Sequence, residues 1–303
     1  MVSTPTLNVL SDLGNYWDDC ESLCSKEIKD VSHNEHHIKK HGGVYIQKDM
    51  HHRKHFDGSA YFDGQGDYLS IPKNDDFKLG VENFTIECWF YIETLQNSWI
   101  PQPGAVGLIS SMGDATSGSG QGDNGWVLGY YENGTIGFHA FANESTTVLS
   151  LSSQSQVEEK KWYHIAAQRN GSSAMLWLNG ELVDSETIYC AKDPCIIGHD
   201  ISYNHDLSIG RFYSDYDSYY HKGYINEVRI SNKARYINEF KDKINDLEPF
   251  FNDKKTRLLI HFDCVKPTGG FPSQGLTNHF PMDGEVSIKG GLLGGSGGSI
   301  QTG

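Results

Sequence analysis

Residues 176–183 of this 303-residue chain read LWLNGELV, two short apolar runs separated by the dipeptide Asn-Gly. Both central residues of a type I′ turn need positive φ, which Asn and Gly adopt most readily, so the stretch predicts a tight β-hairpin. The same dipeptide occurs in YYENGTIGF at 130–138 and in QRNGSS at 168–173. Three such hairpins, which need no crossover helices, indicate an antiparallel sheet.

The pattern extends outward from these hairpins. Between residues 56 and 263, short apolar runs alternate with Gly, Asn and Asp at intervals of about ten residues, which is typical of a sandwich or barrel. We therefore predict an all-β fold, an antiparallel β-sandwich, with one short helix at 234–242. Cys88, within FTIECWF at 84–90, is predicted to be buried in a strand. The other side chains expected in the core are Trp162, Tyr163, Ile165, Leu176, Leu178, Val228 and Ile230.

Two flanking parts differ from the region 56–263. Residues 1–55 read as an irregular N-terminal arm, and its stretch 33–55 carries five Lys/Arg against two Asp/Glu and seven of the 14 histidines. Residues 264–303 lose the alternation, and the last 20 contain eight Gly, as in a flexible or partner-ordered tail. We expect the basic arm to anchor or oligomerise the otherwise acidic protein.

Composition excludes several classes of function. With 25 Lys/Arg against 39 Asp/Glu the formal charge is −14, so no nucleic-acid partner is expected. No apolar run approaches the roughly 18–20 residues of a membrane helix, so no membrane insertion is expected. Residues 1–14 lack the basic and apolar regions of a secretory signal. The six cysteines are therefore interpreted as free thiols, with a Cys190–Cys195 disulfide as the alternative in an oxidising setting.

Several motifs, taken in chain order, resemble those of one known family. They are SAYFDGQGDYLSIP (59–72), FTIECWF (84–90), KWYHIA (161–166), LSIGR (207–211) and GYINEVRIS (223–231). Together they resemble a laminin G-like, concanavalin A-like lectin/glucanase domain. The resemblance implies that the sandwich at 56–263 is a jelly roll.

A narrower resemblance concerns ARY (234–236), Phe240 and TRLLIHFD (256–263), which are similar to a junction in bacteriophage virion and tail proteins that carry this domain. It implies a structural or adhesive component of a virus particle, such as a tail, fibre or capsid-decoration protein made in the host cytoplasm. The implied partners are other virion proteins, further copies of the chain (a trimer is one option) and a host-surface glycan. The alternative is a soluble or secreted, extracellular carbohydrate-binding module.

Catalysis is not expected. The glucanase branch of the resembled family uses a Glu-x-Asp-x-x-Glu strand that places two carboxylates on one face. The nearest string here, ELVDSE at 181–186, puts Glu181 and Asp184 on opposite faces of a strand. The chain also lacks a Gly-x-Ser-x-Gly elbow, a His-Glu-x-x-His zinc motif and a Gly-rich phosphate loop. We therefore predict a protein that is not an enzyme and requires no cofactor.

Two polar loops contain candidate ligand-binding residues. One spans 113–126, and the other, 211–221, interleaves Tyr with Asp. Aromatic faces stack on sugar C–H groups while carboxylates accept hydrogen bonds from sugar hydroxyls, so a glycan fits such loops. A protein interface fits them equally well, and both alternatives stay open. The candidate residues are Trp126, Tyr213, Asp215, Tyr216, Asp217, Tyr219 and Tyr220.

Two kinds of metal site are considered. Members of the resembled family often hold calcium at the rim of the sandwich, and Asp114 and Asp123 are oxygen donors in the first loop, although solvated acidic loops are the alternative. If residues 33–41 were helical, His33, His37 and His41 would share a face suited to a transition metal. We favour instead a pH-sensitive docking arm, because Lys39 and Lys40 oppose a cation.

Overall fold

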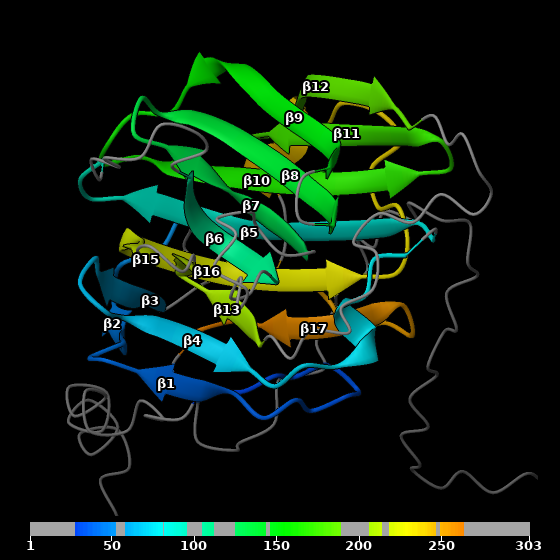
Figure 1. Ribbon diagram of the computed structural model, residues 1–303. Coiled ribbons are helices and arrows are strands. Elements are labelled where there is room, and N and C mark those ends of the chain that lie inside the picture. The colour runs from blue at the N-terminus through cyan, green and yellow to red at the C-terminus, as the bar shows by residue number, and fades with distance from the viewer. Residues whose placement is uncertain are drawn as a thin grey trace, which may run out of the picture. The chain divides into compact units, whose positions relative to one another are not determined.

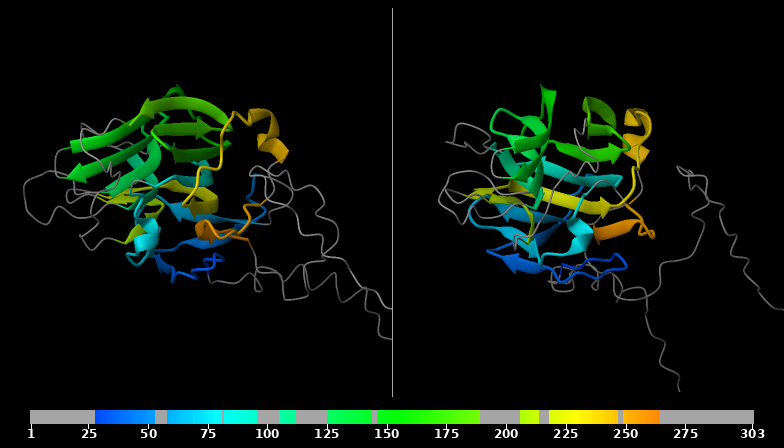
Figure 2. Two further views of the ribbon diagram at one scale, coloured as in Figure 1. Left: turned by 90° about the vertical axis from the view of Figure 1, so that its right-hand side faces the viewer. Right: turned by 45° about the vertical axis from the view of Figure 1, so that its right-hand side comes forward.

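The described residues of the computed structural model form two antiparallel sheets that pack face to face (Figures 1 and 2). They are residues 28–52, 58–80, 82–95, 105–111, 125–143, 146–188, 206–213, 218–246 and 249–263. The predicted all-β sandwich is therefore confirmed.

The strands of both sheets follow a jelly-roll-like order. The seven-stranded sheet runs β1 (Lys39–His41), β4 (Tyr68–Ile71), β13 (Leu207–Ile209), β6 (Ala105–Ser111), β7 (Gly125–Tyr131), β8 (Thr135–Asn143), β9 (Thr146–Gln156). The eight-stranded sheet runs β12 (Glu181–Thr187), β11 (Ser173–Leu178), β10 (Trp162–Asn170), β5 (Phe84–Ile92), β16 (Lys222–Ser231), β3 (Gly58–Asp63), β2 (Tyr45–Lys48), and β17 (Thr256–Ile260) also pairs with β16. A separate hairpin joins β14 (Arg211–Tyr213) to β15 (Ser218–Tyr220).

The main core lies between the sheets and follows from the alternation of side chains along each strand. On β5, Ile86, Cys88 and Phe90 point inward and are fully buried. From the opposite sheet β7 contributes Trp126 and Tyr130. Burying side chains of this size stabilises the fold by about 1.5–3 kcal/mol each. Of the predicted core residues, the buried ones are Cys88, Ile165, Leu176, Leu178, Val228 and Ile230, whereas Trp162 and Tyr163 are half-buried.

A second hydrophobic cluster, the outer core, covers the opposite face of the eight-stranded sheet. It consists of Trp89, Ala166, Trp177, Tyr236, Phe240, Ile244, Phe250 and Leu259. Residues 232–246, the covering segment, lie over this face beside β11 and β12 and include the 3₁₀ helix η2 (Lys241–Asp246), seen in Figure 2. The backbone N–H of Phe240 donates to the carbonyl of Gly180 at 2.8 Å, which fixes the segment to the β11–β12 turn.

All three predicted hairpins are present, but their turns differ. Asn179 and Gly180 both have positive φ, +48° and +77°, as a type I′ turn requires. At the β7–β8 and β10–β11 turns only the glycine is in this region, with φ of +81° at Gly134 and +60° at Gly171. The prediction of a hairpin was therefore correct at each site, and the type I′ geometry holds at one.

Two predictions about flanking and helical structure were wrong. Residues 28–52, which the sequence assigns to an arm, contribute β1 to one sheet and β2 to the other, so this part belongs to the sandwich. Residues 234–240 are not helical, and the 3₁₀ helix η2 follows them; the other 3₁₀ helix, η1 (Asp75–Phe77), lies after β4. Within the described ranges no helix is long and apolar enough to cross a membrane.

Candidate functional site

The sequence-predicted binding residues do not form one site. Trp126 is fully buried, and its indole N–H donates to the carbonyl of Phe77 at 3.3 Å, so its assignment as a ligand contact was wrong. It alternates in phase with Leu128 and Tyr130 on β7, which points it into the main core. Tyr219 is 9% exposed and stacks on Phe212. Tyr213 lies in β14, and Tyr220 is half-buried. Asp114, Asp123, Asp215, Tyr216 and Asp217 lie outside the described residues.

Described residues next to both predicted loops contact β7 or belong to it. Gly125, which follows the first loop, is the first residue of β7. His221 follows the second hairpin, and its Nδ1 lies 3.1 Å from the hydroxyl of Tyr130, next to the last residue of β7.

At the base of the β14–β15 hairpin, Arg211 and His41 enclose the ring of Tyr68. The imidazole of His41 stacks on this ring at 4.0 Å and 3°, and the guanidinium carbon of Arg211 lies 3.7 Å from the ring centroid. Two groups this close must occupy opposite faces of one ring. Burial, followed by Lys39 and Arg211, lowers the pKa of His41. The stack joins β1, β4 and the hairpin, and it leaves Tyr68 without a face for a sugar.

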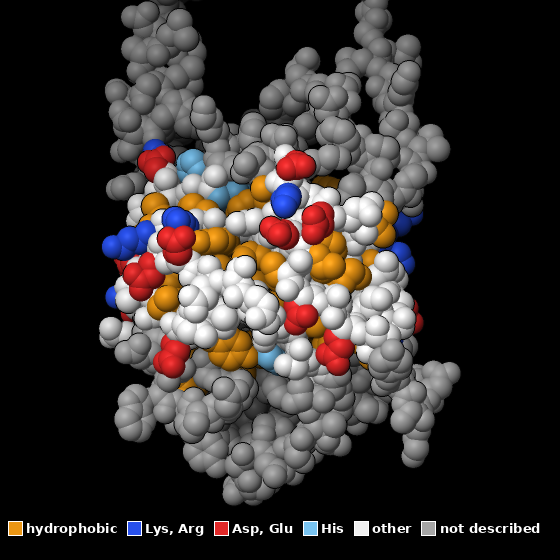
Figure 3. Space-filling view, turned by 90° about the horizontal axis from the view of Figure 1, so that it is seen from above, with side chains coloured by type: hydrophobic (Ala, Val, Ile, Leu, Met, Phe, Trp, Pro, Cys, Tyr) orange, Lys and Arg blue, Asp and Glu red, His pale blue; other side chains and the backbone are white. Residues whose placement is uncertain are grey.

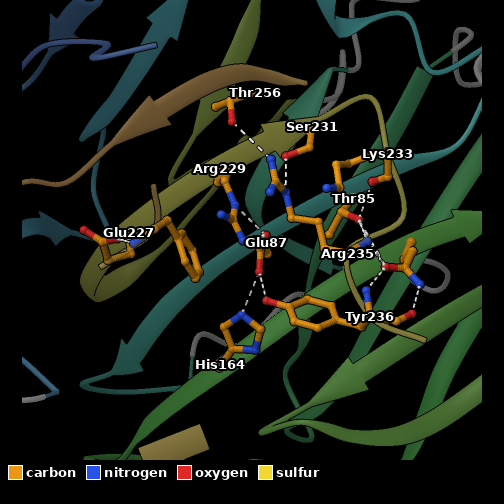
Figure 4. A network of polar contacts seen from close by, with 12 residues as sticks. Thr85, Glu87, His164, Glu227, Arg229, Ser231, Lys233, Arg235, Tyr236 and Thr256 are labelled. Carbon is orange, nitrogen blue, oxygen red and sulfur yellow. Dashed lines mark hydrogen bonds and ion pairs between the residues drawn. The ribbon is translucent and has the colours of Figure 1, made fainter. Parts of the chain in front are cut away.

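Between the eight-stranded sheet and the covering segment lies a buried ionic network around Glu87 (Figure 4). Oε1 of Glu87 contacts Nη2 of Arg229 at 2.6 Å, and Oε2 accepts from Tyr236 and lies 3.1 Å from Nε2 of His164. Burial alone would raise the pKa of Glu87, but Arg229 and then His164 hold it at about 2.

The same network fixes the covering segment to the sheet. Oε1 of Gln168 accepts from the backbone N–H groups of Arg235 and Tyr236 at 2.7 and 2.8 Å. The hydroxyl of Thr85 donates to the carbonyl of Lys233 at 2.8 Å. Glu87 and His164 have no exposed surface, so a substrate cannot reach this cluster of ionisable groups. Its chemistry is structural.

The exposed feature that stands out is an aromatic row across five neighbouring strands of the eight-stranded sheet. In register, Tyr45 pairs with Tyr61, Tyr61 with Tyr224, Tyr224 with Tyr91, and Tyr91 with Trp162. Successive ring centroids lie 5.3, 5.0, 5.6 and 5.6 Å apart. Tyr45 is 46% exposed, and the other four rings are half-buried.

The row lies on the outer face of the sheet, just beyond the outer core. Tyr91 follows Trp89 by two residues on β5 and therefore shares its face. Trp89 is 5% exposed, whereas Tyr91 is more exposed. His52 stacks on Trp89 at 3.8 Å and contacts Trp162 at 5.7 Å, so the row borders the outer core at this point.

The phenols of the row are donors. The hydroxyl of Tyr61 donates to Oε2 of Glu93 at 3.1 Å. Burial and then this carboxylate raise the pKa of Tyr61 to about 12, and burial also raises the pKa of Tyr224. Both phenols are therefore protonated at neutral pH.

Sequence reasoning missed this row. Its one sequence-predicted member, Trp162, was assigned to the core, and it does pack partly against the outer core. The available signal was an aromatic residue next to a core position in each of five strands, as in AYF at 60–62 and GYI at 223–225. Only the strand register shows that these residues are neighbours.

The condition for a shared histidine face, a helix at residues 33–41, is not met. Residues 33–41 are not helical, and His41 lies in strand β1. His36 instead places Nδ1 2.7 Å from Asp30 and Nε2 3.2 Å from Asp76. No group of three or more His, Cys, Asp or Glu suited to a metal occurs among the described residues. Calcium at Asp114 and Asp123 stays a prediction.

A shallow hollow of about 300 Å³ lies between the sheet edges β9 and β12. It is lined by Gln154, Ser155, Leu178, Asn179, Glu181, Leu182 and Val183 and carries no aromatic side chain. Figure 3, which looks onto this edge, shows acidic side chains scattered rather than gathered at one place. The hollow therefore offers neither stacking nor a concentrated charge.

Comparison with known proteins agrees with this architecture. Residues 63–239, more than half of the chain, match the family described as the Concanavalin A-like lectin/glucanases superfamily. No curated protein sequence matches the chain.

Two solved toxin domains share this fold. The binding domain of Paraclostridial Mosquitocidal Protein 1 matches with a TM-score of 0.50 at 15% identity, over 73% of this chain and 49% of that one. The binding domain of botulinum neurotoxin serotype C1 gives the same four values. The CBM40 of a Ruminococcus gnavus IT-sialidase, bound to alpha2,3 sialyllactose, has a TM-score of 0.43 at 16% identity, over 55% of this chain and 83% of that one. The chain thus matches about half the length of the two toxin domains.

Proposed function

The chain belongs to the Concanavalin A-like lectin/glucanases superfamily, and from this premise we propose that it binds carbohydrate through the aromatic row without catalysing a reaction. The observation that carries the proposal is the register of five aromatic side chains on one exposed sheet face. Ring faces pack against the C–H groups of sugars, and phenol hydroxyls exchange hydrogen bonds with sugar hydroxyls.

The scaffold supports such binding because it holds the rings in place. Tyr61 and Tyr91 each lie between two residues that are buried in the main core, Ala60 with Phe62 and Phe90 with Ile92. The backbone that carries these rings is therefore already ordered in the folded protein. Binding then costs less conformational entropy, which leaves more of the interaction energy for affinity.

Glycan-array binding of the full-length chain tests the proposal. An aromatic contact is worth about 0.5–1.5 kcal/mol, so Tyr61→Ala combined with Tyr224→Ala should lose about 1–3 kcal/mol and weaken binding by about fivefold or more. Phe251→Ala is the matched control, because Phe251 is an exposed aromatic residue outside the row. Absence of any bound glycan, or equal loss in the control, would contradict the proposal; thermal unfolding verifies that each variant is folded.

We propose further that the domain acts as an adhesive part of a virus particle, with virion proteins and further copies of itself as partners. The support is the resemblance of residues 256–263 to a virion-protein junction, and this element is β17 with its flanking residues. The β14–β15 hairpin and residues 214–217 are the proposed protein contact. The alternative is a secreted carbohydrate-binding module. Immunogold labelling of purified particles separates the two, since a secreted module would leave the particles unlabelled.

A further inference from the structure

Resting on the proposed carbohydrate binding, we propose that the aromatic row takes a neutral, extended polysaccharide chain laid across the strands, rather than a single sugar or an anionic glycan. The row is long enough for such a chain. The row crosses five strands, and at about 4.8 Å between strands it spans about 19 Å. That length suits several linked sugars, about one for each ring.

The open shape of the row also favours a chain over a single sugar. The rings stand on the outer face of a sheet, which supports a ligand from one side only. A monosaccharide is bound tightly when a concave site buries most of its surface. The hollow between β9 and β12 has no aromatic lining and shares no residue with the row. An open row therefore gains affinity by summing weak contacts along a chain.

The tilt of the rings fits a single sugar chain better than a flat polymer surface. Neighbouring rings are inclined to one another by 43°, 54°, 76° and 56° along the row. They do not form one plane, so they do not fit the flat face of a crystalline polymer. A single chain whose sugars rotate from one unit to the next can meet each ring in turn.

Charged side chains beside the row favour a neutral ligand. Asp63 and Lys222 lie two residues from Tyr61 and Tyr224 on the same strands and hence on the same face. Glu93, which follows the last residue of β5, accepts the hydrogen bond from the hydroxyl of Tyr61 and therefore lies at this face too. This rim of two carboxylates and one ammonium group is half-buried and carries one net negative charge. It offers donors and acceptors to hydroxyl groups and repels an anionic chain.

Affinity electrophoresis of the full-length chain tests the proposal with two neutral polymers, hydroxyethylcellulose and galactomannan, and the acidic polymer polygalacturonate. We expect at least one neutral polymer to retard the protein and polygalacturonate not to do so. Calorimetry with oligosaccharides of the retarding polymer should give the hexamer at least tenfold higher affinity than the dimer. Tyr61→Ala with Tyr224→Ala should abolish retardation, whereas the Phe251→Ala control should not.

A charge variant separates the new proposal from the underlying one. Asp63→Asn combined with Glu93→Gln removes both negative charges, retains one acceptor oxygen at each position, and should make polygalacturonate retard the protein. Two results would overturn the proposal of an extended neutral ligand: equal affinity for dimer and hexamer, or retardation of the native protein by polygalacturonate alone. Either result would leave the proposal of carbohydrate binding intact. If no polymer and no arrayed glycan bound, or if the row variants bound normally, the proposed function itself would fail.

Discussion

Arg229→Met would leave the buried carboxylate of Glu87 without its main counter-charge. Arg229 contacts Oε1 of Glu87 through Nη2 at 2.6 Å and through Nε at 2.8 Å, and Glu87 has no exposed surface. Removing one partner of such a pair costs about 3–5 kcal/mol. Since a domain's free energy of unfolding is typically about 5–15 kcal/mol, we expect a large loss of stability.

The same variant should reverse the contribution of Glu87 to the pH dependence of stability. In the native protein the pKa of Glu87 is held at about 2, below its ordinary 4.5, so its contribution is complete above about pH 4.5 and is lost as pH falls through about 2. Without Arg229, burial dominates and raises the folded pKa above the unfolded one. Relative to the native protein, the variant should therefore gain stability between pH 7 and pH 5.

Urea unfolding at pH 7 and pH 5 measures both effects. The comparison needs the native chain, Arg229→Met, Glu87→Leu and the double variant. The double variant should be more stable than Arg229→Met alone, because no unpaired buried charge remains. A loss below about 1 kcal/mol in Arg229→Met, or a double variant as unstable as the sum of both single changes, would refute the reasoning.

Three further predictions concern other parts of the fold. Trp126→Ala should lower the free energy of unfolding, measured with urea, by about 3–5 kcal/mol, because Trp126 is a buried core residue. An unchanged free energy of unfolding would contradict its place in the core and make it a candidate ligand contact again. Gly223→Ala should lower the midpoint of thermal unfolding. Gly223 has φ of +144°, and a Cβ there would lie 2.0 Å from the carbonyl oxygen of Tyr91. An unchanged midpoint would contradict this close approach. The backbone N–H of Val31, which donates to Leu259, should be best protected from hydrogen exchange between about pH 4 and 6.5. Burial opposes both shifts, but the hydrogen bond with His36 lowers the pKa of Asp30, so the contribution of Asp30 to stability is lost as pH falls through this lowered pKa. Asp30 in turn raises the pKa of His36, so the contribution of His36 is lost as pH rises through this raised pKa, and His36→Gln should abolish the alkaline loss.

Local signals explain what the sequence could predict. The Asn-Gly hairpins were predictable because a tight turn depends on the conformational freedom of two adjacent residues. Strands β1 and β2 were not, because KKH and YIQK are short and polar, as edge strands commonly are. Trp126 was misassigned because it follows a polar loop, although its phase with Leu128 and Tyr130 indicates an inward direction.

The candidate site depends on information that single segments do not carry. The members of the aromatic row are at positions 45, 61, 91, 162 and 224, and each looks like an ordinary strand residue in its own segment. A shift of one residue in any pairing would turn that ring to the other face of the sheet. The long-range register therefore creates the surface, and the structure was needed to see it.

A crystal structure of the full-length chain with the neutral oligosaccharide that binds most tightly shows whether the aromatic row is the binding site. We expect electron density for a sugar chain that crosses β2, β3, β16, β5 and β10 over the aromatic row. Density at the β14–β15 hairpin or in the hollow between β9 and β12, with the row unoccupied, would contradict it.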